Sequence, residues 1–198
     1  MMIENYAKYL EFITNKINGF FEKQKPYIFC RKGCSLCCEK GEYPWSEIEY
    51  KYIMEGFLKL SLELQNKIKE NIKKIKEDKK NFKEDGVFMY QCPFLINKSC
   101  VLYEYRGIIC RSFGLLVSRE DNKKPQIPFC SSLGLNYSNV YDKEKKIISG
   151  EMWKETGIEE EPKLFNVSYN FLTNESFAKG FKFQFGDKKP LIDWFEET

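Results

Sequence analysis

Eight cysteines are the residues of this sequence whose type and spacing can do chemistry. The first four fall within nine residues, in the pattern Cys30-x3-Cys34-x2-Cys37-Cys38. The other four are more widely spaced and are Cys92, Cys100, Cys110 and Cys130. Thiolates two or three residues apart converge on one ion because a turn brings their side chains to one side, and Gly33 supplies backbone freedom before Cys34. The spacing of the first four therefore predicts a metal site, and the other four cysteines are candidates to complete an eight-cysteine ligand set, with a buried, inert thiol as the favoured alternative for a scattered single such as Cys130.

The sequence contains no histidine. This excludes a histidine general base, a Cys–His or Ser–His nucleophilic pair, and every zinc site that needs imidazole. An all-sulfur ligand set selects zinc held by four thiolates, or iron, including a [4Fe-4S] cluster, and excludes calcium and magnesium. The pattern assigns no catalytic residue, and it leaves open whether the protein is an enzyme.

The compartment decides between metal binding and disulfide bonds. No basic segment followed by an apolar run marks residues 1–8 as a secretory signal. No apolar run approaches the roughly 18 to 20 residues that a membrane span needs. We therefore expect a cytoplasmic protein with reduced thiols and no membrane partner. Four disulfides are the alternative if the chain is exported by another route.

Charge and length limit the remaining partners. The 198 residues contain 32 Lys and Arg against 29 Asp and Glu, and 42% of them are hydrophobic. This composition predicts one domain over 1–198, with no clear nucleic-acid partner because the net charge is only +3. Metal ions are the expected partners, and a protein partner stays open.

Three elements are expected to surround the first cysteine cluster. Apolar residues recur every three or four positions from Ile3 to Phe20, which predicts a helix over 2–24 that Pro26 ends. Residues 27–45 are expected to form a cysteine-rich loop. Ser46 and Glu49 have the spacing of a capping box, which predicts a long helix that reaches about Phe82.

Short, turn-punctuated segments are predicted to hold the second set of cysteines. Residues 94–103 have the pattern of a hairpin that turns at 97–98, and apolar residues alternate over 113–117 as in a strand. The chain after 135 is rich in loop residues and ends in a predicted short amphipathic helix over 190–197. The expected fold is α+β and mainly α, with two long helices flanking a cysteine-rich metal loop and a small β-hairpin region stapled by metal.

Residues near the cysteines are candidates to contact the metal or cofactor. Thiolates leave excess negative charge at such a site, so N–H donors or cations are needed nearby. The candidates are Tyr103, Arg106 and Arg111, with Arg31 as a further cation beside a cysteine. Packing of the hairpin is the favoured alternative for Tyr103, and ordinary salt bridges are the alternative for the arginines. Cys37 and Cys38 are adjacent, so their side chains are expected to diverge, which favours a second metal or the edge of a cluster.

The combined pattern resembles the YkgJ-type cysteine-cluster family, whose members are described as zinc- or iron-chelating domains with eight cysteines. The residues that carry the resemblance are the eight cysteines, Pro93, Phe94, Leu95, Tyr103, Arg106 and Arg111. The resemblance covers roughly 27–135, the expected cysteine-cluster core. This chain has Gly107 where the family usually has proline, which loosens the turn before Cys110 and leaves the ligand set intact.

Three functions are compatible with these features. The first is a metal-binding protein that holds zinc or iron. The second is an iron–sulfur enzyme, such as an S-adenosylmethionine-dependent protein lysine methylase, because flagellin lysine N-methylases carry a similar cysteine region. The first three cysteines also have the spacing of radical S-adenosylmethionine proteins, but Leu36 stands where an aromatic residue is usual. The third is a non-enzymatic partner-binding module with a structural zinc. The metal, the number of sites and the oligomeric state stay open.

Overall fold

The computed structural model describes residues 1–31, 33–118 and 125–195. It is about 51% helical and contains small two-stranded antiparallel sheets, which confirms the α+β, mainly α class. The helices are α1 (Met2–Lys23), α2 (Leu36–Glu39), α3 (Glu47–Phe57), α4 (Leu62–Asn81), α5 (Ile108–Ser112), α6 (Gly150–Thr156), α7 (Tyr169–Leu172) and α8 (Glu175–Phe181). The strands are β1 (Pro44–Ser46), β2 (Leu95–Ile96), β3 (Ser99–Cys100), β4 (Tyr141–Asp142), β5 (Ile147–Ile148) and β6 (Lys188–Pro190). The 3₁₀ turns are η1 (Lys25–Tyr27), η2 (Tyr103–Tyr105), η3 (Phe129–Leu133) and η4 (Leu191–Trp194).

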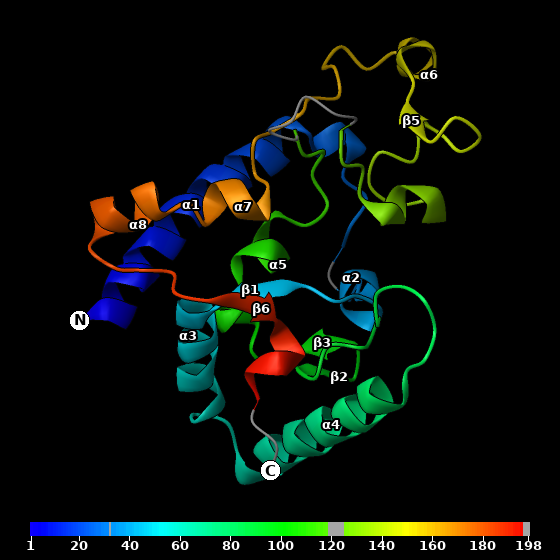
Figure 1. Ribbon diagram of the computed structural model, residues 1–198. Helices are drawn as coiled ribbons and strands as arrows, with labels where there is room; N and C mark the ends of the chain where they lie inside the picture. Colours follow the sequence, from blue (N-terminus) through cyan, green and yellow to red (C-terminus); the bar gives the residue numbers. More distant parts are fainter. Residues whose placement is uncertain (32, 119–124, 196–198) are drawn as a thin grey trace.

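Helix α1 confirms the first predicted helix. It ends at Lys23, and Pro26 follows within η1, where its fixed φ suits the start of a helical turn. Its buried face has the predicted three-to-four-residue spacing, from Tyr6 to Ile17. This face packs against α3, α5 and α8, and α1 and α8 lie side by side (Figure 1). The Tyr9 hydroxyl also donates a hydrogen bond to the carbonyl of Leu172 in α7.

The prediction of one long helix over 46–82 is wrong in one respect, because the structure has two helices there, α3 and α4. The capping box is present, since the Glu49 carboxylate accepts from the backbone N–H of Ser46, but α3 ends at Phe57. Ser61 then caps α4 by accepting from the Leu64 N–H at 3.3 Å. The break lets α3 lie against α1 while α4 turns away beneath the β2–β3 hairpin (Figure 1).

The predicted hairpin is confirmed as β2 and β3. Leu95 pairs with Cys100, and the two turn residues, Asn97 and Lys98, have φ values of 50° and 58°. Both residues are thus left-handed, as a type I′ turn requires. The strand predicted over 113–117 is largely wrong: Phe113 caps the end of α5, and Val117 alone makes bridges, to Gln126 and Phe165.

The short helix predicted over 190–197 is confirmed in part, as the short 3₁₀ helix η4 over Leu191–Trp194. It follows strand β6, which pairs with β1, Trp45 opposite Lys189. Leu191 and Ile192 are buried, and the Leu191 N–H donates to the carbonyl of Tyr43 at 3.1 Å. The helix ends at Trp194, before the predicted end, and residues 196–198 lie outside the described chain.

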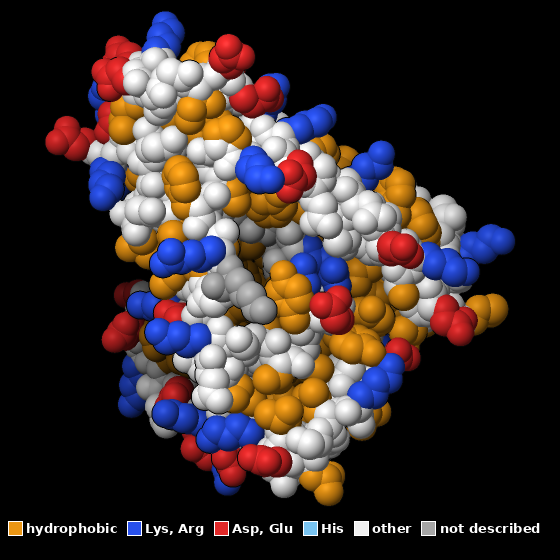
Figure 2. Space-filling view, turned by 180° about the vertical axis from the view of Figure 1, so that it is seen from behind, with side chains coloured by type: hydrophobic (Ala, Val, Ile, Leu, Met, Phe, Trp, Pro, Cys, Tyr) orange, Lys and Arg blue, Asp and Glu red, His pale blue; other side chains and the backbone are white. Residues whose placement is uncertain are grey.

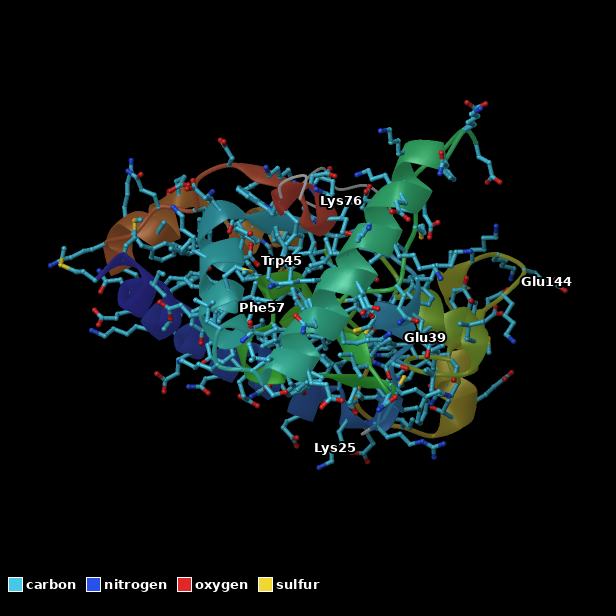
Figure 3. All side chains as sticks on the ribbon, turned by 90° about the horizontal axis from the view of Figure 1, so that it is seen from below. Lys25, Glu39, Trp45, Phe57, Lys76 and Glu144 are labelled. Atoms are coloured by element: carbon cyan, nitrogen blue, oxygen red, sulfur yellow. The ribbon has the colours of Figure 1, made fainter. Side chains whose placement is uncertain are left out.

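Two main hydrophobic cores lie on either side of α3. The helical core is made by the buried face of α1 with residues of α7, α8 and the segment after α8: Tyr6, Tyr9, Leu10, Ile13, Ile17, Ile48, Ile108, Leu115, Val167, Tyr169, Leu172, Ala178, Phe183 and Phe185. The hairpin core consists of Trp45, Ile53, Phe57, Ile68, Phe94, Leu102 and Leu191. Trp45 and Phe57 lie between α3 and α4 (Figure 3). Cys92, Cys100 and Cys110 pack against the hairpin core, so three of the eight cysteines predicted as ligands are attached to it.

A matched pair of glycine substitutions tests the packing of α3. A Cβ added to Gly56 would lie 2.4 Å from the ring of Tyr105 in η2, whereas one added to Gly19 in α1 would meet nothing within 4 Å. We expect Gly56→Ala to reduce the free energy of unfolding by about 1–3 kcal/mol, through overpacking. Gly19→Ala should increase it by up to about 1 kcal/mol, through helix propensity. Urea denaturation measures both, and equal effects would contradict the packing described here.

The surface mixes charged side chains of both signs with exposed apolar groups. Figure 2 shows lysines and arginines interspersed with acidic residues on one face, with apolar side chains exposed between them. None of the helices in the described ranges combines the length and apolar character needed to cross a bilayer.

Candidate metal centre

The first half of the cysteine-rich loop is fixed to the segment that contains Cys130. The side-chain oxygen of Asn136 accepts the backbone N–H groups of Phe29 and Cys30, at 2.9 and 2.8 Å. Asn136 is buried, and its own carbonyl accepts the Ser131 hydroxyl at 2.6 Å. The backbone carbonyl of Cys130 accepts the N–H of Leu135 at 3.0 Å. Asn136 thus holds Cys30 and Cys130, a hundred residues apart, in one region.

The second half of the loop is fixed to the segment before the hairpin. The backbone N–H of Cys92 donates to the carbonyl of Cys38 at 2.8 Å. Gly41 and Tyr90 form an antiparallel bridge beside it. The backbone carbonyl of Cys92 in turn accepts the N–H of Leu95. Leu95 is the residue that pairs with Cys100 across the hairpin. Backbone hydrogen bonds therefore connect the Cys37–Cys38 end of the loop to Cys92 and Cys100.

A buried carboxylate positions Cys110. Glu49 is completely buried, and its Oε1 accepts the N–H of Ile108 at 2.8 Å, at the start of α5. Its Oε2 accepts the N–H and hydroxyl of Ser46, at 2.9 and 2.7 Å, and the Tyr169 hydroxyl at 2.6 Å. Gly107 is required beside it, because a Cβ there would lie 2.9 Å from Glu49 Oε1. Glu49 therefore joins α3, α5 and α7 and sets where α5 begins, two residues before Cys110.

The buried Glu49 carboxyl gives a pH-dependent prediction. Burial raises its pKa above the ordinary value, although its four hydrogen-bond donors favour the charged form. A raised folded-state pKa stabilises the fold fully below the ordinary pKa, and this contribution is lost as pH rises through the folded pKa. We expect the free energy of unfolding of wild type minus that of Glu49→Gln to fall with increasing pH across this window, by at most about 1.4 kcal/mol per pH unit. Urea denaturation of both proteins measures it, and a difference independent of pH would contradict the raised pKa.

Cys37 and Cys38 face the same region, so the expectation that they diverge is wrong. Their Sγ atoms lie 3.9 Å apart on the short helix α2, which the sequence pattern did not predict. The Tyr43 hydroxyl donates to the carbonyl of Cys37 at 2.9 Å and fixes the start of this turn. Sulfur atoms gather beside Glu39, the last residue of α2 (Figure 3).

Nearby thiols contribute to the raised pKa values of Cys30 and Cys130. Partial desolvation, followed by the neighbouring thiols of Cys34, Cys37 and Cys130, raises the pKa of Cys30 to about 11. Burial also raises the pKa of Cys130, and Cys34 and Cys37 add to this shift. The hydrogen bonds of Asn136 bring the segments that carry Cys30 and Cys130 together.

Three thiols of the hairpin region also have raised pKa values. Burial raises the pKa of Cys110 to about 12, with further contributions from Cys100 and Cys37. The pKa of Cys92 is raised well above its ordinary value by burial and by Cys110 and Cys100. Arg106 opposes these effects, because its charge lowers the pKa of Cys100 and Cys110. Cys37 also contributes to the raised pKa values of Cys30, Cys130, Cys92 and Cys110.

The three candidate contact residues differ in position. The Arg106 guanidinium stacks on the Tyr103 ring, with its Cζ atom 3.7 Å from the ring centroid, and Tyr103 is 57% exposed. Arg106 is thus the candidate whose charge acts on two cysteines. Arg111 instead donates to the carbonyls of Arg106 and Glu104, at 3.1 and 2.7 Å, and to the hydroxyl of Thr14 in α1, at 3.2 Å. These bonds tie α5 to η2 and to α1.

Sequence reasoning missed two residues that organise the site. Glu49 was recognised in its capping box, but no pattern indicated its bonds to Ile108 and Tyr169. Asn136 carries no sequence signal, because the groups that it binds are backbone N–H groups more than a hundred residues away. Both act by fixing the backbone beside a cysteine.

Substitution of Asn136 tests the link between the loop and η3. Asn136→Ala leaves the partly buried N–H groups of Phe29 and Cys30 without their acceptor. We expect the free energy of unfolding to fall by about 1–3 kcal/mol, because both residues are exposed and water replaces part of the lost hydrogen bonding. The Cys30 and Cys130 thiols should also react faster with a thiol reagent, as followed by mass spectrometry of the labelled peptides. Asn139→Ala is the control, and an equal gain in thiol reactivity there would contradict the role of Asn136.

All eight cysteines are free thiols, and backbone hydrogen bonds attach the segments that carry Cys92 and Cys130 to the cysteine-rich loop. Across 1–31, 33–118 and 125–195, no group of three or more cysteine or acidic side chains is arranged to hold a metal ion. The eight thiols have the donor chemistry that zinc and iron–sulfur centres use. No protein-family profile, curated protein or solved structure matches the chain.

Proposed function

We propose that this protein binds zinc or iron through its eight cysteines, in the reducing environment of the cytoplasm. The observation that carries the proposal is the double attachment of the cysteine-rich loop. Asn136 holds its Cys30 end beside the Cys130 segment, and the Cys38 carbonyl holds its other end to Cys92. Thiols from four separate parts of the chain thereby share one region, which eight dispersed cysteines would have no reason to do.

The chemistry of the thiols supports a cation in this region. Free thiols that raise one another's pKa are protonated near neutral pH, and several thiolates together would repel one another. A divalent cation removes this repulsion, and its binding releases the thiol protons, so affinity rises with pH. Arg106 supplies further positive charge beside Cys100 and Cys110. The side chains need to turn toward the ion, a local movement that leaves the backbone attachments intact.

Metal analysis on protein purified without oxygen tests this function. Elemental analysis, an optical spectrum and acid-labile sulfide are measured on the same sample. Iron with sulfide and visible absorbance identifies an iron–sulfur centre, whereas a colourless protein with stoichiometric zinc identifies a thiolate zinc site. The matched control is Cys37→Ser/Cys38→Ser, which should bind less metal. A wild-type chain that retains neither metal, and takes up neither on reconstitution, refutes the proposal.

A further inference from the structure

We infer that a hollow beside α5, which we call the Arg111 hollow, binds an α-amino acid with an apolar side chain. The hollow has a volume of about 220 Å³ and lies where α1, α3, η2 and α5 meet. Polar side chains from all four elements line it: Glu11, Thr14, Asn15, Tyr52, Glu104 and Arg111. At about 30 Å³ for each water molecule, this volume corresponds to roughly seven waters, which suits a ligand of amino-acid size. The described residues that line the hollow include no cysteine, so the site is separate from the proposed metal-binding function.

Arg111 is the positive group of the hollow, and three hydrogen bonds hold its guanidinium in place. The Nε–H donates to the carbonyl of Arg106 at 3.1 Å. One terminal nitrogen donates to the carbonyl of Glu104 at 2.7 Å, and the other donates to the Thr14 hydroxyl at 3.2 Å. A guanidinium has five N–H groups, so one N–H on each terminal nitrogen has no partner among the described residues.

The charge of Arg111 has no counterion within the described ranges. None of the ion pairs formed there includes this residue. Burial, followed by the charge of Arg106, lowers the pKa of Arg111, but a guanidinium still stays protonated near neutral pH. The two unused N–H groups belong to the planar fork that binds both oxygens of a carboxylate. The carboxylate of the ligand is therefore assigned to Arg111.

The Tyr52 hydroxyl is a further donor for the ligand. Tyr52 comes from α3 and lines the same hollow as Arg111. Its hydroxyl takes part in none of the side-chain hydrogen bonds of the described residues. A carboxylate bound to Arg111 accepts several hydrogen bonds, so the hydroxyl completes its recognition.

Two carboxylates in the hollow require a positive group on the ligand. Glu11 on α1 and Glu104 on η2 are exposed, and neither side chain is used in an ion pair or hydrogen bond within the described part of the chain. Together with Arg111, these groups bring one positive and two negative charges, so the hollow repels a simple anion such as phosphate. A ligand with an ammonium group next to its carboxylate pairs with both signs.

The rest of the lining selects the side chain of the ligand. Ala7 and Leu10 of α1 are its apolar members. They lie on the same helix as Glu11, so a ligand whose ammonium group pairs with Glu11 places its side chain near them. Burial of apolar surface is favourable, which indicates a short aliphatic side chain such as that of valine or leucine.

Calorimetric titration of the wild-type chain with L-alanine, L-valine and L-leucine tests the site. Each amino acid is compared with the acid that lacks its amino group and the amine that lacks its carboxylate; for L-leucine these are 4-methylpentanoate and 3-methylbutylamine. We expect saturable binding of at least one amino acid, at least about tenfold tighter than binding of either analogue, because each analogue leaves a charge of the hollow unpaired. Absence of binding by all three amino acids overturns the inference, and so does equal binding of an amino acid and its deaminated acid.

Substitutions in the hollow identify the groups that bind. Glu104→Gln removes a carboxylate and keeps the backbone carbonyl that orients Arg111, so affinity should fall at least about tenfold. Arg111→Lys keeps the charge but loses the fork, and affinity should fall to a similar extent. Glu63→Gln, an exposed change on α4 outside the hollow, is the matched control and should bind as the wild type does.

The design separates loss of binding from loss of folding. Arg111 also links α5 to α1, so circular dichroism must show that Arg111→Lys is folded. If it is not folded, Glu104→Gln and the ligand analogues decide the question. Equal affinities of Glu104→Gln and Glu63→Gln would overturn the assignment of the ammonium group. Amino-acid binding by a chain that takes up no metal would leave this inference standing while the proposed function fails.

Discussion

Removal of the metal is expected to unfold the cysteine-containing half of the protein while the helical core stays folded. The helical core contains no cysteine among its buried residues or among the partly buried hydrophobic residues packed on it. The segments 27–42 and 86–135, by contrast, contain little regular secondary structure within the described residues. Their connection depends on the loop attachments and, in our proposal, on metal–sulfur bonds.

The size of this effect follows from the strength of metal binding. Structural zinc contributes about 10–16 kcal/mol to the folding of small peptides, which is comparable with the roughly 5–15 kcal/mol stability of a whole domain. Even a part of this energy should lower the melting midpoint by more than about 10 °C in a chain of this size. Circular dichroism with and without a chelator measures the shift.

Hydrogen exchange separates local from global unfolding. After chelation, amide protection should be lost over 27–42 and 86–106 and kept in α1 and α5, where Tyr9 and Ile108 of the helical core are buried. Readdition of zinc or iron should restore protection. An unchanged melting midpoint and unchanged exchange in the metal-free protein would show that metal does not hold these segments.

Replacement of Glu49 by alanine should be among the most destabilising single changes. The substitution leaves the backbone N–H groups of Ser46 and Ile108 and the Tyr169 hydroxyl without their acceptor, at a junction between α3, α5 and α7. Each unsatisfied buried group costs about 1–3 kcal/mol, so we expect a loss of about 3–5 kcal/mol. Urea denaturation measures the change.

Glu47 provides the matched control for this substitution. It lies two residues earlier on α3, is partly exposed, and forms an ion pair with Lys51 at 2.5 Å. An exposed i,i+4 pair is worth about 0.3–0.5 kcal/mol, so Glu47→Ala should have a small effect. Glu49→Ala should also speed the reaction of the Cys110 thiol, because the start of α5 is no longer fixed. Equal stability losses for the two variants would contradict the role of Glu49.

Local patterns predicted the elements that local interactions form. Helix α1 has an unbroken apolar stripe and a proline after its end, and the hairpin turn begins with Asn97, a residue type that tolerates the left-handed conformation. The capping box at Ser46 was predictable because its groups are three residues apart. In each case the residues that mark the element lie within one short segment of the sequence.

Distant contacts decided the elements that the patterns did not predict. The stripe from Ile48 to Ile75 continues across the break at 58–61, but Ile48 belongs to the helical core and Ile68 to the hairpin core. A single straight helix does not serve both. At the C-terminal end, no local pattern predicted that Lys188–Pro190 forms β6 and pairs with β1, directly before the short helix η4.

The sequence by itself determined the kind of ligand: eight thiols and no imidazole leave soft or borderline metals as the ions that this cluster can hold. Which thiols are neighbours was decided by the tertiary structure alone. Asn136 and the Cys38 carbonyl attach the two ends of one loop to different parts of the chain. Their partners are backbone N–H groups, which every residue except proline carries, so no residue type in the sequence marks where these bonds form.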